Sequence, residues 1–191
     1  MNIRKFLSAW VIACLLSLLI PGSTQPQPSS NNSDIIEQFP NTVSQQVFTL
    51  LSLDCGVNGE LQRFQDLITE LDVDISPLLF LTLREGAPVS VQRNMTSEAQ
   101  QVFDARQRWL KENGNELFDP ETVRRLLAQT QEDYIDETLR VTNLRYQENA
   151  IRGLGYVGNA EAIDPILDAA KREPALSILA ETAVESINER Q

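Results

Sequence analysis

The sequence predicts an all-α fold in which antiparallel helix pairs stack into a short, curved, right-handed α-solenoid. From residue 41 to the end, apolar residues recur every three or four positions, which is the period of an amphipathic helix, and no segment alternates like a strand. A triplet of an apolar residue, a Ser or Asp and a proline also recurs every 43 to 45 residues. Each copy predicts a helix start, because the side-chain oxygen caps a free N–H and proline suits the first helical position. The copies are Ile75-Ser76-Pro77, Phe118-Asp119-Pro120 and Ile163-Asp164-Pro165.

The first 24 residues have the pattern of a secretory signal peptide. Arg4 and Lys5 precede an apolar run over residues 6–20, and a Pro-Gly pair ends it. The run is shorter than the ~20 residues that a mature membrane-spanning helix needs, so we expect cleavage and a secreted or periplasmic protein. The alternative is an uncleaved anchor over residues 6–20. Residues 25–40, rich in Pro, Ser and Asn, are predicted to form a flexible linker.

The domain over 41–191 is predicted to consist of helices throughout. The sequence Ser97-Glu98-Ala99-Gln100 has the form of a capping box that would begin the helix over 97–112. In the last segment one face is apolar, while Glu181, Glu185 and Glu189 form a face expected to be solvated. The predicted helices cover 42–53, 60–71, 97–112, 120–132, 134–149, 145–154 and 176–187.

Acidic residues precede basic ones at i,i+4 spacing in several of these helices. Such pairs contribute only about 0.2–0.5 kcal/mol each, so they indicate solvated helix faces and not a site. The pairs are Asp104/Arg108, Glu121/Arg125, Asp136/Arg140 and Glu148/Arg152.

The composition excludes several kinds of chemistry. The chain has 191 residues, a formal charge of -11 and no histidine, so it cannot build a Ser-His-Asp or Cys-His site or a His-ligated zinc or haem site. A chain this acidic lacks the positive surface that nucleic acid requires. We therefore expect no catalytic centre, no cofactor, no metal site and no nucleic-acid partner. The charge instead favours a partner with a basic surface.

In the segment Glu148–Ile163, a first predicted helix ends in Gly-Leu-Gly. An apolar residue and a Gly-Asn pair follow, and an Ala-Ile pair then begins a second predicted helix. It resembles the best-known part of a HEAT repeat, and residues 179–187 are similar to the first helix of another copy. The resemblance is closest to the short HEAT-like repeats of phycobilin lyase subunits and bacterial scaffold proteins, and it covers about residues 145–190. It implies a HEAT/armadillo-like solenoid whose stacked second helices line a partner-binding surface.

Gly153, Gly155 and Gly158 have the Gly-x-Gly-x-x-Gly spacing of a dinucleotide-binding loop. That motif requires a preceding strand, whereas polar, helical residues precede it here. We therefore predict that the glycines end a helix, through positive φ and close contact between helices.

Two other segments have simple structural interpretations. Residues 54–60 resemble half of a calcium loop but lack its required ligands, which favours a turn. Residues 132–137 contain four acids, for which a solvated helix face is expected. Cys55 is expected to be a buried, inert thiol, with an intermolecular disulfide as the alternative.

The predicted function is binding: an exported scaffold or adaptor that contacts another protein and touches a membrane only through its N-terminal segment. The resemblance also leaves open a phycobilin-lyase-like protein that handles a chromophore, and the apolar segment leaves open a membrane-anchored structural envelope protein. The candidate partner-binding residues are Arg124, Arg125, Asp168, Lys171 and Arg172, on predicted second helices.

Overall fold

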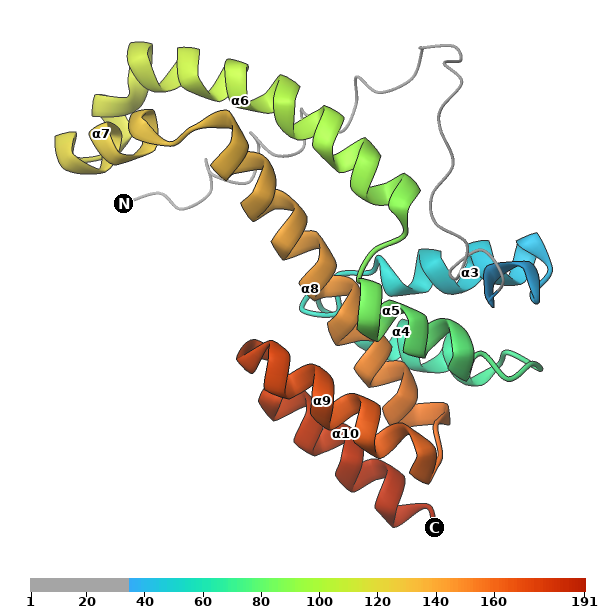
Figure 1. Ribbon diagram of the computed structural model, residues 1–191. Helices are drawn as coiled ribbons and strands as arrows, with labels where there is room; N and C mark the ends of the chain where they lie inside the picture. The colour runs from blue at the N-terminus through green and yellow to red at the C-terminus, as the bar shows by residue number, and fades with distance from the viewer. Residues whose placement is uncertain (1–34) are drawn as a thin grey trace. The chain divides into compact units, whose positions relative to one another are not determined.

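The computed structural model describes residues 35–191, and this part of the chain consists of helices and turns without a strand (Figure 1). The all-α prediction is therefore confirmed for these residues. The predicted signal peptide lies outside them, as does most of the predicted linker. The main helices are α3 (Asn41–Leu51), α4 (Glu60–Thr69), α5 (Ser76–Glu85), α6 (Val89–Leu117), α7 (Pro120–Ala128), α8 (Gln131–Val157), α9 (Ile163–Arg172) and α10 (Ser177–Glu189). Two short 3-10 turns, η2 (Ala160–Ala162) and η3 (Pro174–Leu176), flank α9.

The hydrophobic core surrounds the C-terminal half of α8. Ala150, Ile151 and Leu154 of this helix are completely buried. Helices α3, α4, α5 and α10 pack against α8, and α9 packs against α5 and α10. Figure 1 shows α9 and α10 lying side by side at the C-terminal end of the chain. We call α3, α4, α5, α9 and α10, together with the C-terminal half of α8, the body.

A second group of helices extends from the body, and we call it the arm (residues 97–142). In it α6 packs against both α8 and α7, and α7 lies at the far end (Figure 1). The rings of Phe103 and Tyr134 are 5.7 Å apart, and the Arg106 guanidinium lies 5.1 Å from the Tyr134 ring. Few side chains of the arm are buried, so a large share of its residues face solvent.

The predicted helix starts need correction in the arm. Helix α6 begins at Val89 and continues for 29 residues, so Ser97 is an exposed residue inside the helix and not the start of a capping box. Helix α8 runs for 27 residues without a break, where separate helices over 134–149 and 145–154 were expected. Its start is a capping box formed by Thr130 and Asp133.

Only one of the repeated triplets caps its helix as predicted. Asp119 Oδ1 accepts hydrogen bonds from the backbone N–H groups of Glu121 at 3.0 Å and Thr122 at 2.9 Å. Helices α5 and α9 begin without a side-chain cap. The Ser76 N–H donates instead to Asp74 Oδ1 at 2.9 Å, one residue before the triplet.

The folded part of the chain begins before residue 41. Ile35, Ile36 and Phe39 are partly buried and pack against the hydrophobic core. The end of the predicted linker over 25–40 therefore belongs to the folded part, because apolar side chains there find core partners.

Candidate protein-binding site

At the C-terminal ends of three helices of the body, backbone carbonyl oxygens accept hydrogen bonds from side chains that lie later in the chain. At the end of α3, the buried Asn149 amide donates to the carbonyl oxygens of Leu51 at 3.0 Å and Leu53 at 2.8 Å. At the end of α8, Arg190 donates to the carbonyl oxygens of Gly155 and Gly158, the latter at 3.0 Å. These side chains satisfy carbonyl groups that a helix end leaves without an internal partner.

The end of α5 uses one of the candidate binding residues in the same way. The Leu83 carbonyl oxygen accepts hydrogen bonds from Gln147 at 3.1 Å and from Arg172 at 3.5 Å. Arg172 therefore joins α9 to α5. This contact gives Arg172 a structural role that sequence spacing alone did not reveal.

The other candidates on α9 interact with each other. Lys171 Nζ lies 2.8 Å from Asp168 Oδ1, and both side chains are exposed. The hydrogen bond from Lys171 lowers the pKa of Asp168. The pair is solvated, so it contributes little to stability.

Arg124 and Arg125 lie on the exposed side of α7, near the far end of the arm. None of the ion pairs among residues 35–191 includes either arginine, so the predicted Glu121/Arg125 pair does not form. Of the predicted i,i+4 pairs, Glu148/Arg152 is present at 3.6 Å. Arg140 pairs with Glu137 at 2.8 Å instead of Asp136.

The structure does not bring the α7 and α9 candidates together. Helix α7 packs on α6 in the arm, whereas α9 packs on α5 and α10 in the body. Arg124 and Arg125 therefore belong to one surface, and Asp168 and Lys171 belong to another.

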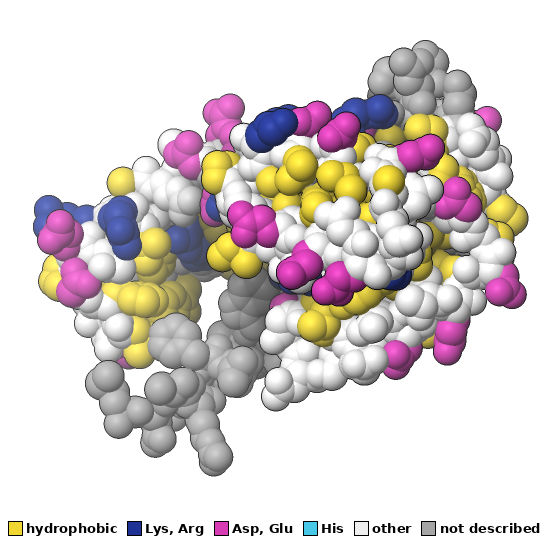
Figure 2. All heavy atoms as spheres, turned by 90° about the horizontal axis from the view of Figure 1, so that it is seen from below, with side chains coloured by type: hydrophobic (Ala, Val, Ile, Leu, Met, Phe, Trp, Pro, Cys, Tyr) yellow, Lys and Arg dark blue, Asp and Glu magenta, His cyan; other side chains and the backbone are white. Residues whose placement is uncertain are grey.

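A shallow, open groove lies between α9 and α10. It has a volume of about 620 Å³ and an open side, with Leu167 of α9 and Val184 of α10 as its apolar residues. Figure 2 views this side of the molecule and shows hydrophobic side chains bordered by acidic ones. The remaining residues of the groove are Glu181, Glu185, Asn188 and Glu189.

The three glutamates share one exposed face of α10, four residues apart. None of the ion pairs among residues 35–191 includes them. The sequence identified this face as solvated but gave no sign of the groove. The residue that completes the groove is Leu167, which is 37% exposed although its neighbour Ile166 is completely buried. The apolar pattern of the sequence does not distinguish the exposure of these two residues.

The glycines of the Gly-x-Gly-x-x-Gly sequence allow close packing, but not through positive φ. Gly153 and Gly155 lie inside α8, and Gly158, at its C-terminal end, has φ -73°. A Cβ on Gly153 would lie 2.8 Å from Ile68 Cδ1, and one on Gly155 would lie 3.2 Å from the Ala183 Cβ. The expected helix contact is confirmed, and the expected positive φ is wrong. Among residues 35–191, positive φ is found at Gly59 and Gly86.

Two of the four acids over residues 132–137 have structural partners. Asp133 belongs to the capping box of α8, and Glu137 pairs with Arg140. Cys55 is half-buried, and burial raises the pKa of its thiol. Within residues 35–191 no group of Cys, Asp and Glu side chains has the arrangement of a metal site.

None of the helices in residues 35–191 combines the length and apolar character that crossing a bilayer requires.

Comparisons of the chain with protein-family models, with curated proteins and with solved structures find no match.

Proposed function

We propose that this protein is an exported, HEAT-like helical scaffold that binds another protein through the groove between α9 and α10. The partner presents a basic surface. One observation carries the proposal: Glu181, Glu185 and Glu189 border an apolar groove without an ion pair to any residue of 35–191.

The charge of the groove favours a cationic occupant. Like charges four residues apart on a helix destabilise it by about 0.2–0.5 kcal/mol per pair, and here the pairs are Glu181/Glu185 and Glu185/Glu189. A bound Lys or Arg side chain would offset this repulsion. Charge complementarity of this kind also raises the rate of association and selects against acidic partners.

The apolar residues of the groove favour an amphipathic helix as the bound element. Leu167 and Val184 provide contact for apolar side chains spaced three or four residues apart on a partner helix. Basic residues on the flanks of that helix would then reach the glutamates of α10. The groove therefore suits a basic amphipathic segment better than a small molecule.

The packing at the C-terminal end of the chain supports the solenoid part of the proposal. Helix α10 packs against both α8 and α9, and η2 and η3 form short connections between these helices. This is the order of elements that the resemblance over residues 145–190 implies. Stacked helical repeats of this kind commonly act through extended binding surfaces.

The export part of the proposal depends on residues 1–24. N-terminal sequencing of the exported protein tests it directly. A new N-terminus close to residue 25 is expected. Protein that retains Met1 and is found in the membrane fraction would contradict cleavage and indicate an uncleaved anchor over residues 6–20.

The groove can be tested with a synthetic basic amphipathic peptide of Leu and Lys, labelled for fluorescence anisotropy. The E181K/E185K variant should bind it at least about tenfold more weakly, because attraction becomes repulsion. The matched control is E112K/E116K, which changes the net charge equally at two exposed acids of α6. This control should bind like the wild-type chain.

Two results would contradict the proposal. Equal weakening by both variants would show that the peptide responds to net charge and not to the groove. Equally strong binding of a Leu and Glu peptide of the same pattern would show that the glutamates do not select the partner.

A further inference from the structure

We infer that a pocket in the body binds a small organic cation, a primary ammonium group attached to an apolar group. The pocket lies between the loop that joins α4 to α5 and the turn that follows α8, and both segments can be followed in Figure 1. It shares no residue with the groove between α9 and α10. The inference is therefore independent of the proposed function.

The size and the apolar residues of the pocket suit a small molecule. Its volume is about 290 Å³, and it is more enclosed than the groove. Since a water molecule occupies about 30 Å³ in the liquid, this volume holds about ten non-hydrogen atoms. Ile68 and Ile75 of the pocket belong to the buried core, whereas Val73 and Val157 are 43% and 37% exposed. An apolar group in the pocket would cover part of these two valines.

The polar residues of the pocket are fixed in position but keep free hydrogen-bonding atoms. Asp74 Oδ1 accepts a 2.9 Å hydrogen bond from the Ser76 N–H, and Asn159 Oδ1 accepts one of 2.9 Å from the Glu161 N–H. Among the described residues, no group bonds to Asp74 Oδ2, Ser76 Oγ or the Asn159 amide nitrogen. The second carboxylate oxygen of Asp74 and the Ser76 hydroxyl are therefore available to accept hydrogen bonds from an ammonium group.

The charge around the pocket favours a cation. Residues 70–76 and 157–163, which include most of the pocket, contain four acidic residues and neither Lys nor Arg. Arg190 also reaches this region, where it donates to the Gly158 carbonyl oxygen at 3.0 Å, but it does not line the pocket. With Arg190 counted, the surroundings still carry three net negative charges. The acidic residues are Glu70, Asp72, Asp74 and Glu161.

The start of α5 does not provide a site for an anion. Helix starts bind anions through free backbone N–H groups. Here the N–H groups of Ser76, Leu78 and Leu79 all have acceptors within the chain, and Pro77 has no N–H. Together with the Asp74 carboxylate, this arrangement selects a cationic ligand over an anionic one.

The test uses 2-phenylethylamine, a primary amine of suitable size, as the probe. Titration of the ¹⁵N-labelled protein up to about 10 mM should shift the amide signals of residues 68–76 and 157–159, with a dissociation constant of about 1 mM. The matched neutral and anionic compounds are 2-phenylethanol and 3-phenylpropionate. Both should bind at least about fivefold more weakly, because neither offers an ammonium group to Asp74.

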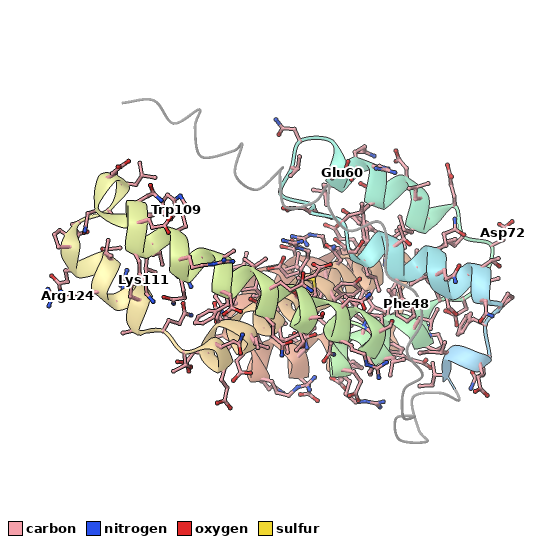
Figure 3. All side chains as sticks on the ribbon, turned by 90° about the horizontal axis from the view of Figure 1, so that it is seen from above. Phe48, Glu60, Asp72, Trp109, Lys111 and Arg124 are labelled. Carbon is pink, nitrogen blue, oxygen red and sulfur yellow. The ribbon has the colours of Figure 1, made fainter. Side chains whose placement is uncertain are left out.

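Two variants test the two parts of the pocket. Asp74→Asn keeps an oxygen for the Ser76 N–H but removes the charge, and it should weaken amine binding about fivefold. The matched control is Asp72→Asn, which makes the same change at an exposed residue outside the pocket, at the outer edge of the body (Figure 3). This control should bind like the wild type. Val157→Phe, which fills the pocket, should remove binding of the amine and of the alcohol alike.

Several results would overturn the inference. Absence of binding up to 10 mM, or equal affinities for the amine and the alcohol, would show that the pocket does not select an ammonium group. Equal weakening by Asp74→Asn and Asp72→Asn would show a response to net charge. Binding that survives Val157→Phe, in a protein whose circular dichroism is unchanged, would place the amine elsewhere. None of these results affects binding of the basic peptide to the groove, so the proposed function would stand.

Discussion

The buried amide of Asn149 holds the end of α3 by donating a 2.8 Å hydrogen bond to the carbonyl oxygen of Leu53. The same nitrogen donates to Leu51, and Asn149 Oδ1 accepts a hydrogen bond from Arg152 at 2.8 Å. Asn149 is 1% exposed, so its own amide group cannot turn to water instead. One side chain of α8 thus completes the hydrogen bonding of a helix that ends almost 100 residues earlier.

We expect Asn149→Ala to lower the free energy of unfolding by about 2–3 kcal/mol, because it removes the amide donor from the buried Leu51 carbonyl and the half-buried Leu53 carbonyl. Urea denaturation followed by circular dichroism measures this change. The control is Asn115→Ala, at an exposed position of α6, which should change stability by less than about 0.5 kcal/mol. Equal effects of the two substitutions would contradict this role for Asn149.

Gly86 and Gly59 both have positive φ, but they differ in ψ and only Gly86 is crowded. Gly86 has φ 76° and ψ -141°, and a Cβ there would lie 2.6 Å from Asn143 Oδ1. Gly59 has φ 88° and ψ -20°, with no other atom within 4 Å of the Cβ position.

We therefore expect Gly59→Ala to cost about 1 kcal/mol from backbone strain alone, and Gly86→Ala to cost about 2–4 kcal/mol. The difference reflects both the displaced Asn143, which accepts a 3.0 Å hydrogen bond from the Ala87 N–H, and the ψ of -141° at Gly86, which residues other than glycine rarely adopt at positive φ. Thermal unfolding of the two variants provides the comparison. Gly86→Ala should have the lower midpoint, and the reverse order would refute the crowding.

Arg190 makes the end of the chain important for stability. Deleting Gln191 alone removes an exposed residue and should leave stability unchanged. Deleting residues 190–191 should lower the free energy of unfolding by about 1–2 kcal/mol, because the carbonyl oxygens of Gly155 and Gly158 lose a charged donor. Chemical denaturation of the two truncated chains measures the difference, and equal stabilities would show that the Arg190 contacts contribute nothing.

Gly153 should resist a substitution that ordinarily strengthens a helix. Gly→Ala inside an exposed helix gains about 1 kcal/mol from its propensity. At Gly153 the new methyl group would lie 2.8 Å from Ile68 Cδ1 and 3.1 Å from Leu79 Cδ1, inside the core. Overpacking of this kind costs about 1–3 kcal/mol, so we expect no net gain from Gly153→Ala and a clear loss from Gly153→Val. A more stable Gly153→Val chain would contradict the close packing.

The cap at Asp119 should make part of the stability depend on pH. Hydrogen bonds from Thr122 and Glu121 lower the pKa of Asp119 below its ordinary value near 4. A lowered pKa means that the stabilisation is complete above the ordinary value and is lost as pH falls through the lowered one. Asp119→Ser keeps a capping oxygen that does not titrate, so its melting temperature should fall less than that of the wild type between pH 7 and pH 2. Parallel falls in the two chains would contradict this interpretation.

Sequence periodicity located the elements that carry a clear amphipathic pattern. The helix predicted over 60–71 is Glu60–Thr69, and the one predicted over 176–187 is Ser177–Glu189. The first turns of α6 lack that pattern, because most of their residues are polar. The polar N-terminal half of α8 lacks it too, because it belongs to an arm with few buried side chains. Their boundaries were therefore missed.

The contacts that complete the body could not be derived from local pattern. Asn149, Arg172 and Arg190 act on carbonyl groups 98, 89 and 35 residues away, and hydropathy carries no signal for such distant pairs. The groove escaped prediction for the same reason: its acidic face was recognised, but the apolar residue that completes it comes from a neighbouring helix.

The long-range capping of α3 and α5 also has a consequence for how the protein is made. Leu51 and Leu83 leave the ribosome 98 and 64 residues before the amides of Asn149 and Gln147 that bind them. At about 5–20 residues per second, these helix ends wait for several seconds without their donors. The first half of the nascent chain therefore cannot complete its tertiary structure on its own. Such a delay suits a chain with a predicted secretory signal, because a polypeptide that is still unfolded can be threaded across a membrane.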